Sequence, residues 1–285
     1  MNKKRIINLA FILGAVITLS VLLYPIVADH VNARNQSQVV AKYINDVAAM
    51  DDGERQALLE AAHAYNSRLL RRGDRFQYTE AGTAEYLKQL DAGRGVMGIL
   101  AIDKINVKLS IYHGTDEGVL QIGLGHMQDT SLPVGGAGTH AFITGHRGLP
   151  SSTLLTELDK LAEGDTFVLY VMGETLTYRV DQILTVEPDE TQALDIEPGK
   201  DYCTLVTCTP YGVNTHRLLV RGHRIPNAEV RTLVADAHRL DKLLVLPLLL
   251  LPVLLALLIF AVVKCIKISK GGTEKWPNGS RAYYL

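Results

Sequence analysis

The chain of 285 residues is 47% hydrophobic and 21% charged, and its formal net charge is −1. This balance provides no strongly basic face, so we expect no nucleic-acid partner. The length has room for roughly one or two ordinary domains. Three cysteines are too few for the disulfide framework of a small secreted fold.

A first apolar run lies close to the N-terminus. Residues 6–27 carry no charged side chain and follow Lys3, Lys4 and Arg5. About 20 such residues cross a bilayer as a helix. We expect residues 1–28 to be an uncleaved membrane anchor. The run exceeds the roughly 7–15 residues of a signal-peptide apolar core, and no clear small-residue cleavage site follows it. A cleaved signal peptide is the alternative.

Residues 29–94 are expected to form a helical extension. Apolar side chains recur at helical spacing through residues 39–47 and 58–69, and a short helix is expected over residues 83–90. Residues 72–78 break this pattern with a charged, glycine-containing sequence, which predicts a loop.

From residue 95 the pattern changes to short β segments separated by turn residues. Many short strands at such spacing are typical of a closed barrel or a sandwich. We therefore expect residues 95–226 to form one mainly β domain, followed by a linker over residues 227–242. The expected strands cover residues 97–102, 109–112, 139–144, 166–171, 176–182, 202–207 and 217–224.

One thiol in this β region has the neighbours that nucleophilic chemistry requires. Cys208 ends a predicted strand and is followed by a Pro-Tyr-Gly turn and then by Arg217. His146 lies upstream, two residues after the end of another predicted strand. A thiolate, an imidazolium and a fixed cation can together attack an acyl carbon and stabilise the oxyanion that forms. We therefore identify Cys208 as candidate nucleophile, His146 as general acid and Arg217 as oxyanion stabiliser.

Both partners of the thiol have rivals in the sequence. His140 and His216 are the nearest alternatives to His146. Arg221 lies four residues after Arg217 and on the same face of its strand, which makes it the main alternative cation. We expect Arg221 to be a solvated residue near the strand end.

The remaining cysteines and histidines predict no further site. Cys203 lies five residues before Cys208, and an odd offset places the two on opposite faces of one strand, so Cys203 is expected in the core. The spacing of the histidines does not match a compact zinc site, and we expect neither a metal nor a cofactor. The histidines considered are His113, His126, His140 and His146.

A second apolar run covers residues 243–263 and precedes Lys264, Lys267 and Lys270. Basic residues favour the cytoplasmic side of a span. We therefore expect two membrane-spanning helices in a cell membrane, with the domain between them outside the cytoplasm. Both termini, including a tail over residues 264–285, would be cytoplasmic. A buried core helix is the alternative for the second run, although a proline-containing leucine run suits lipid better.

The sequence TLVTC at residues 204–208, followed by TPYG and then NTHRLLVRG up to residue 222, resembles the sortases. These are the cysteine transpeptidases of Gram-positive surfaces. Other segments resemble the class C branch, which polymerises pilins. They are residues 98–115, 125–150 and 154–165.

The resemblance implies an eight-stranded sortase-type β-barrel, and it supports Cys208, His146 and Arg217 as the catalytic residues. Cys208 would cleave a Leu-Pro-x-Thr-Gly-like sorting signal through a thioester, and a lysine of the next pilin would accept the acyl group. The implied partners are pilins and surface proteins with C-terminal sorting signals. One alternative is a wall-anchoring sortase that uses a peptidoglycan amine; another is a non-enzymatic receptor or assembly scaffold.

Class C sortases also carry an Asp-Pro-aromatic segment that covers the active site. The nearest match here is Asp74-Arg75-Phe76, in which Arg replaces Pro. The resemblance implies a lid in which Asp74 pairs with an active-site arginine and Phe76 caps the thiol. Without proline φ is not fixed, so we expect a looser lid. An ordinary charged surface loop is the alternative.

Overall fold

The computed structural model describes residues 3–72, 75–76, 79–93, 95–188, 190 and 194–227. Met1–Ile26 and Val27–Ala235 belong to separate compact units, and each is described by itself. The predicted second span at residues 243–263 lies outside the described residues, as does the tail that follows it.

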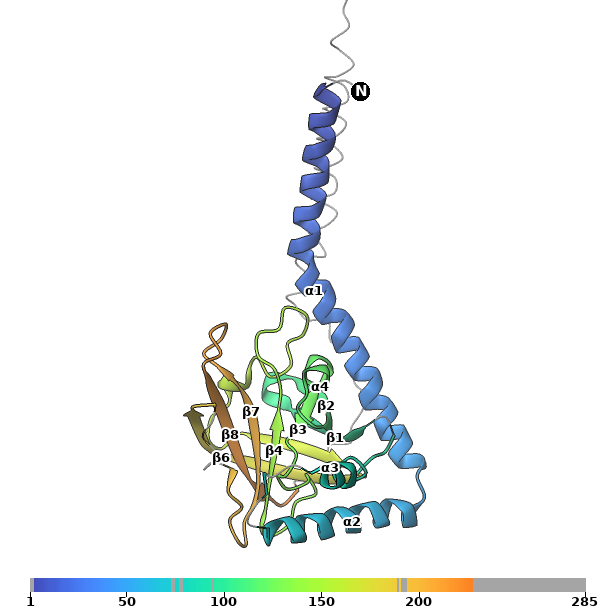
Figure 1. The fold of residues 1–285 in the computed structure, drawn as a ribbon, viewed down its shortest axis with the longest axis vertical. Helices are drawn as coiled ribbons and strands as arrows, with labels where there is room; N and C mark the ends of the chain where they lie inside the picture. The colour runs from blue at the N-terminus through green and yellow to red at the C-terminus, as the bar shows by residue number, and fades with distance from the viewer. Residues whose placement is uncertain are drawn as a thin grey trace, which may run out of the picture. The chain divides into compact units, whose positions relative to one another are not determined.

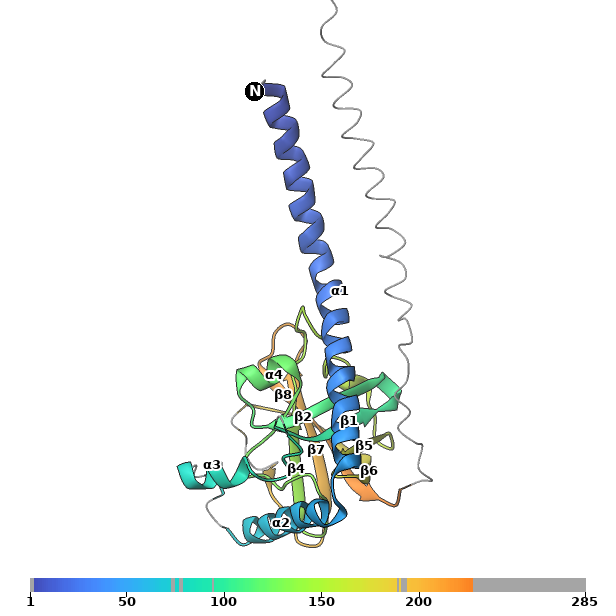
Figure 2. The same ribbon diagram turned by 90° about the vertical axis from the view of Figure 1, so that its right-hand side faces the viewer.

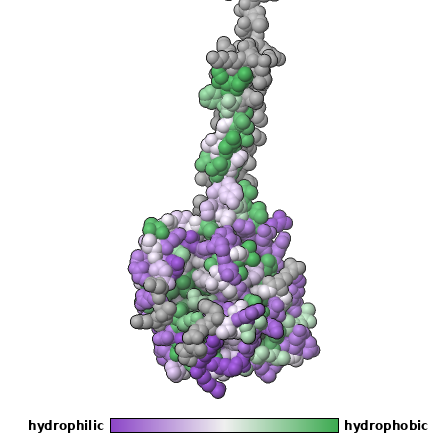
Figure 3. All heavy atoms as spheres, in the orientation of Figure 1, coloured by the Kyte–Doolittle hydropathy of each residue, from purple (hydrophilic) through white to green (hydrophobic). Residues whose placement is uncertain are grey.

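The first apolar run forms the beginning of a long helix, α1 (Lys3–Ala49). Among the described residues, α1 is the one helix long and apolar enough to cross a membrane. Its N-terminal part exposes large hydrophobic side chains such as Phe11 and Leu22, and green, hydrophobic residues are prominent on this part of the chain in Figure 3. The prediction of an apolar, membrane-capable N-terminal helix is therefore confirmed.

Eight strands close into a barrel in the order β1-β2-β3-β4-β7-β8-β6-β5, which confirms the predicted fold class (Figure 1). The β2–β3 and β4–β7 pairs are parallel, and the other pairs are antiparallel. The strands are β1 (Val96–Ile102), β2 (Val107–His113), β3 (Leu124–His126), β4 (Thr139–Thr144), β5 (Thr166–Val171), β6 (Glu174–Val186), β7 (Asp201–Thr209) and β8 (His216–Ile225).

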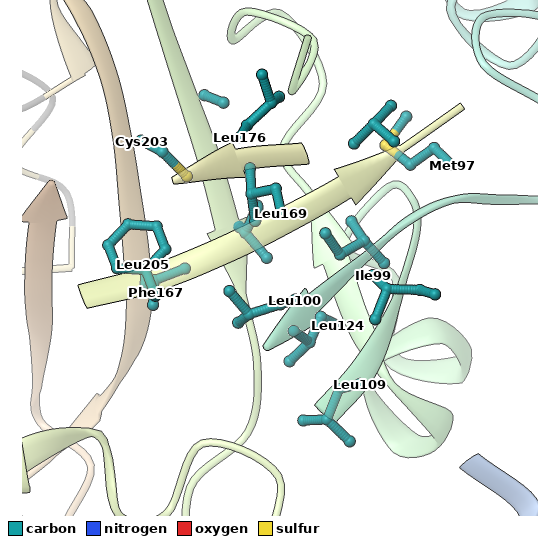
Figure 4. Packing of buried hydrophobic residues seen from close by; sticks show 14 of the residues in the cluster. Met97, Ile99, Leu100, Leu109, Leu124, Phe167, Leu169, Leu176, Cys203 and Leu205 are labelled. Carbon is teal, nitrogen blue, oxygen red and sulfur yellow. The ribbon is translucent and has the colours of Figure 1, made fainter. Parts of the chain in front are cut away.

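Apolar side chains from several strands meet in the barrel interior (Figure 4). Leu100, Leu169 and Leu205 are fully buried there, although they lie far apart in the sequence. Every residue of β1 is buried. The Tyr43 hydroxyl of α1 donates to the carbonyl of Met97 at 3.1 Å, which fixes the helix on the barrel.

The helical extension is divided into two helices near residue 50, although the helical pattern in the sequence showed no break there. Asp51 caps α2 (Asp52–Leu70) by accepting a 2.8 Å hydrogen bond from the backbone of Gly53, so a new helix begins there. The remaining helices in the described part of the chain are α3 (Glu80–Tyr86), α4 (Glu117–Ile122) and the short 3₁₀ helices Asp103–Ile105 and Leu158–Lys160.

The helix α2 closes one end of the barrel, as Figures 1 and 2 show. Asn66 on α2 accepts a hydrogen bond from the backbone of Leu132 at 2.7 Å and donates one to its carbonyl at 3.0 Å. Leu70 packs on Gly138, and the amide of Gly138 donates to the carbonyl of Lys200 at 2.7 Å. Because β4 and β7 begin next to these residues and run in parallel, both strands end together at the far end of the barrel.

Candidate active site

The parallel pairing of β4 and β7 brings His146 level with Cys208. Thr144 is paired with Val206 at the end of β4. Beyond this pair, the amide of Gly145 donates to the carbonyl of Val206 at 3.0 Å. His146 lies two residues after Thr144, and Cys208 lies two residues after Val206. Strand register therefore aligns two residues that are 62 positions apart in the sequence.

Glycine at position 145 lets the backbone before His146 pass close to the side chain of Leu124 on β3. A Cβ atom there would lie 2.5 Å from Cδ2 of Leu124, well inside contact distance. The loop that follows is held to the barrel end, since the amide of Leu155 donates to the carbonyl of His146 at 3.2 Å. The backbone that carries His146 is thus fixed on both sides.

The antiparallel pairing of β7 and β8 places Arg217 directly opposite Cys208. Directly opposed residues on neighbouring strands present their side chains on the same face. Cys208 is partly exposed, whereas Cys203, five positions earlier, is fully buried in the barrel. The prediction that the two cysteines occupy opposite faces is confirmed.

Arg217 has no carboxylate partner among the described residues. Its guanidinium donates only to the backbone carbonyls of His216 and Asn214, at 3.2 and 3.4 Å. Among the described residues, therefore, no neighbouring acid neutralises this positive charge. A guanidinium in that state can donate hydrogen bonds to an oxyanion.

Arg221, the alternative cation, binds other groups. Its Nε donates to Asp181 at 3.1 Å, and Glu197 lies 3.7 Å from Nη1. The guanidinium also lies 4.2 Å from the ring centroid of Tyr202. The expectation that Arg221 is simply solvated is wrong, because ion pairs and a cation–π contact hold it on the barrel wall.

His140, the nearest rival of His146, is a structural residue. Its Nδ1 lies 2.8 Å from the carbonyl oxygen of Asp195, and its Nε2 lies 2.7 Å from the hydroxyl of Thr204. Burial lowers the pKa of His140 to about 4, so the ring is neutral at ordinary pH. A general acid must be protonated when it acts, and His140 does not meet that requirement.

His126 and His216 also have partners. His126 is completely buried, with Nε2 2.9 Å from the carbonyl oxygen of Ser131. His216 lies 3.1 Å from the carboxylate of Glu187. No group of three metal-binding side chains gathers in the described part of the chain. His146 itself lies with Nε2 3.5 Å from Oε1 of Glu117.

Glu117 is a neighbour that the sequence analysis did not select. It stands in the first turn of α4, a helix that was not predicted. An acidic residue directly after Asp116 is a recognisable signal for a helix start. The helix has only six residues, which is too short for a clear apolar period.

An apolar surface adjoins the thiol on the outer face of the barrel. Val206 precedes Cys208 by two residues, so both side chains point to the same side of β7. Val206 packs with buried neighbours on the adjacent strands, and partly buried side chains from the connecting loops cover them. The buried members are Phe142, Val186, Val206 and Leu219, and the covering residues are Met127 and Leu194.

The predicted lid segment is only partly described. Asp74 lies outside the described residues, so its pairing with an arginine stays a prediction. Arg75 contacts the loop between β6 and β7: its guanidinium lies 3.5 Å from the carboxylate of Asp195 and donates to the carbonyl of Leu194 at 3.5 Å. Phe76 is 37% exposed, and its ring centroid lies 5.4 Å from the guanidinium carbon of Arg75.

Comparison with protein families and curated proteins identifies the domain. A model of the sortase domain matches residues 100–225. Sortase D of Bacillus subtilis is 30% identical over 131 residues, which are 45% of this chain and 63% of that protein. Sortase A of Streptococcus agalactiae is 30% identical over 140 residues, 48% of this chain and 56% of that protein. The match thus spans less than two thirds of either relative.

Solved structures show longer matches. Sortase C1 from Streptococcus agalactiae is 49% identical with a TM-score of 0.66, and the alignment covers 67% of this chain and 100% of that one. Sortase C of Streptococcus pneumoniae is 41% identical, with a TM-score of 0.60 and coverage of 68% and 100%. A lid mutant of sortase A from Corynebacterium diphtheriae is 44% identical, with a TM-score of 0.57 and coverage of 63% and 97%. The chain therefore belongs to the sortase family, and its likeness to sortases C1 and C places it with the class C sortases.

Proposed function

We propose that this protein is a membrane-anchored cysteine transpeptidase that joins pilin subunits. Cys208 is the nucleophile, His146 the general acid and base, and Arg217 the oxyanion stabiliser. One observation carries this assignment: Cys208 lies directly opposite Arg217 on the paired strands β7 and β8. The parallel register of β4 and β7 supports His146 as the third member.

The first half of the reaction cleaves the sorting signal. The Cys208 thiolate attacks the carbonyl carbon of the Thr–Gly bond, and a carbon–sulfur bond forms. Negative charge moves to the carbonyl oxygen, where the Arg217 guanidinium donates hydrogen bonds. The carbon–nitrogen bond then breaks, and the His146 imidazolium gives its proton to the departing amine. A thioester between Cys208 and the threonine carbonyl remains.

The second half transfers the acyl group to an acceptor amine. A neutral lysine amine of the next pilin attacks the thioester carbonyl, and neutral His146 takes the proton that the amine loses. The carbon–sulfur bond breaks as the isopeptide bond forms, and the electron pair returns to sulfur. Cys208 is again a thiolate and His146 an imidazolium, so the cycle closes without a cofactor.

The apolar surface beside the thiol supports a sorting signal of the Leu-Pro-x-Thr-Gly type. Val206 and its cluster adjoin Cys208 on the outer face of β7. A leucine and a proline placed against the partly buried covering residues Met127 and Leu194 would bury apolar area at about 25 cal/mol per Å². Pilins and other surface proteins that carry such a C-terminal signal are the proposed partners.

We further propose that the protein crosses a cell membrane twice, with the barrel outside the cytoplasm and both termini inside. The apolar N-terminal half of α1 supports the first crossing. The uncharged run at residues 243–263 and the lysines that follow it support the second.

The segment containing Asp74 and Phe76 is proposed as a lid over the thiol. The contacts of Arg75 with Asp195 and with the carbonyl of Leu194 support it, because they tie the segment to a loop that covers the apolar surface. The relative from Corynebacterium diphtheriae, solved as a lid mutant, supports the same assignment.

The full chain, purified in detergent, provides the test. Incubation with a Leu-Pro-x-Thr-Gly peptide should give an acyl-enzyme that intact-mass spectrometry detects on Cys208. Cys208→Ala should not form it, whereas Cys203→Ala should, because Cys203 is buried in the core. Transpeptidation by Cys208→Ala would refute the assignment.

A competition experiment identifies the acceptor. Equal amounts of a pilin domain and a peptidoglycan stem-peptide amine are offered to the preformed acyl-enzyme, and the products are sequenced by mass spectrometry. Isopeptide bonds to a pilin lysine support the polymerase. Exclusive transfer to the stem peptide would indicate a wall-anchoring enzyme.

A further inference from the structure

The Nε2 atom of the His146 imidazole is buried and has no hydrogen-bond partner among the described residues. Most buried polar atoms in folded proteins are paired. The carboxylate of Glu117 nevertheless lies close by, with Oε1 3.5 Å from this nitrogen. A small rotation of either side chain would close the gap to a charge-assisted hydrogen bond.

The fold holds Glu117 in this position from outside the catalytic strands. Glu117 begins α4, and Leu120 of that helix packs on Gly125 of β3. Gly125 is paired with Thr144, the last residue of β4. The carboxylate is also oriented within the helix, because the Nε2 of Gln121 donates to its Oε1 at 2.6 Å. α4 therefore delivers a fixed negative charge beside the end of β4, where His146 lies.

Several elements carry charged or ionisable groups near the end of β4. Cys208 lies on β7, the strand paired with β4, Arg217 lies opposite Cys208 on β8, and Arg147, the next residue in the chain, is paired with Asp159. Glu117 is thus the carboxylate found within ion-pair distance of His146 among the described residues. Its pKa is lowered by the hydrogen bond from Gln121 and then by His146.

We propose that Glu117 is a positioning residue that holds His146 as an oriented imidazolium. This inference rests on the proposed transpeptidase function. With Nε2–H directed to Glu117, Nδ1 is left to exchange a proton with the departing and the incoming amine. The same carboxylate offsets the repulsion between the imidazolium and Arg217, so that both cations can stand beside one thiolate. Because Glu117 is exposed, we expect a moderate effect that salt weakens.

The test compares pH profiles of the full chain in detergent. Glu117→Gln keeps the shape of the side chain and removes its charge, and Glu117→Asp keeps the charge on a shorter arm. Asp116→Asn is the matched control, since Asp116 is the exposed neighbour whose side chain makes no capping hydrogen bond. For each variant, kcat/KM for peptide cleavage and the rate of Cys208 alkylation are measured from pH 5 to pH 9 at low and high salt.

For Glu117→Gln we expect kcat/KM at neutral pH to fall about 2- to 5-fold, the range for an exposed ion pair. The alkaline limb of the profile should move to lower pH, and high salt should reduce the difference from wild type. Glu117→Asp should recover part of the loss, and Asp116→Asn should match wild type. A purely structural role of Glu117 would lower activity at all pH values without moving the limb.

Two results would separate this inference from the proposed function. If Cys208→Ala abolishes the acyl-enzyme but the profile of Glu117→Gln superimposes on wild type, the role of Glu117 is wrong and the transpeptidase stands. If Asp116→Asn shifts the limb as much as Glu117→Gln does, the effect is general surface charge and the inference is again wrong. Retained acylation in Cys208→Ala would instead overturn the proposed function itself.

Discussion

The hydroxyl of Thr207 donates a 2.8 Å hydrogen bond to the carbonyl of Gly145, and so joins the residue before Cys208 to the residue before His146. Thr207 is buried on the inner face of β7, away from the outer face that carries the thiol. This buried contact adds to the strand register and to the hydrogen bond from Gly145 to the carbonyl of Val206 in placing the proposed nucleophile and general acid relative to each other.

Replacement of Thr207 by valine should uncouple the two catalytic side chains. The change preserves the side-chain shape and removes the bond, which should destabilise the fold by about 1 kcal/mol. If register alone does not hold the geometry, kcat/KM should fall roughly 10- to 100-fold, because small misplacements of reacting groups are costly. A lower melting temperature with unchanged kcat/KM would show that Thr207 contributes only to stability.

Arg217 and Arg221 form a matched pair on one face of β8. Arg217→Ala should lower kcat/KM by about 100-fold or more, the cost of losing an oxyanion donor, and should leave the melting temperature almost unchanged. Arg221→Ala should mainly destabilise the barrel, because it leaves Asp181 without its arginine partner. Peptide-cleavage kinetics and thermal melts of both variants check this pattern. The reverse pattern would make Arg221 the catalytic cation.

The lid predicts partial autoinhibition of the resting enzyme. Asp74→Ala combined with Phe76→Ala should speed alkylation of Cys208 and cleavage of the peptide, since substrate no longer spends binding energy on opening. Arg75→Ala should give a smaller increase, because Asp195 is an exposed partner. Stopped-flow labelling with a thiol-reactive probe measures the rates. Equal rates in wild type and both variants would identify the segment as an ordinary surface loop.

Two buried histidines should make the fold sensitive to acid. Burial lowers the pKa of both His126 and His140 to about 4, from an ordinary value of 6.5. Between these values the unfolded chain binds more protons than the folded one. Stability is therefore lost as pH falls from about 6.5 towards 4, by up to about 1.4 kcal/mol per pH unit for each histidine.

Denaturant unfolding followed by circular dichroism at pH 7 and pH 5 measures this loss. His140→Gln should reduce the dependence on pH by roughly half, and the exposed His63→Gln should not change it. An identical loss of stability in wild type and His140→Gln would show that other groups cause the acid sensitivity.

The two-span topology is tested with reporter fusions in cells. Fusions at Ala28 and at Lys242 should both report an outside location, because basic residues follow the second apolar run and precede the first. A C-terminal tag should resist protease on intact cells. Cleavage of that tag from outside would contradict the second crossing.

The sequence was enough to select Cys208, His146 and Arg217 as candidates. Its strand pattern left a barrel or a sandwich open, and the resemblance to sortases selected the barrel. Short β segments follow from local alternation and turn residues, and seven of the eight strands carry that signal. The strand β3 was missed because three residues are too few to show a period. Cys203 and Cys208 were assigned to opposite faces from their odd spacing alone, because side chains alternate along any strand.

Only the tertiary structure decided how these residues are arranged. Strand order and register set His146 level with Cys208, and local sequence does not encode pairing between strands 62 residues apart. The tertiary structure also determined the roles of the two alternative residues. His140 is neutral because the fold buries it, and Arg221 is paired because β6 brings Asp181 beside it. Glu117 lies beside His146 because α4 packs on β3, which is also a tertiary contact.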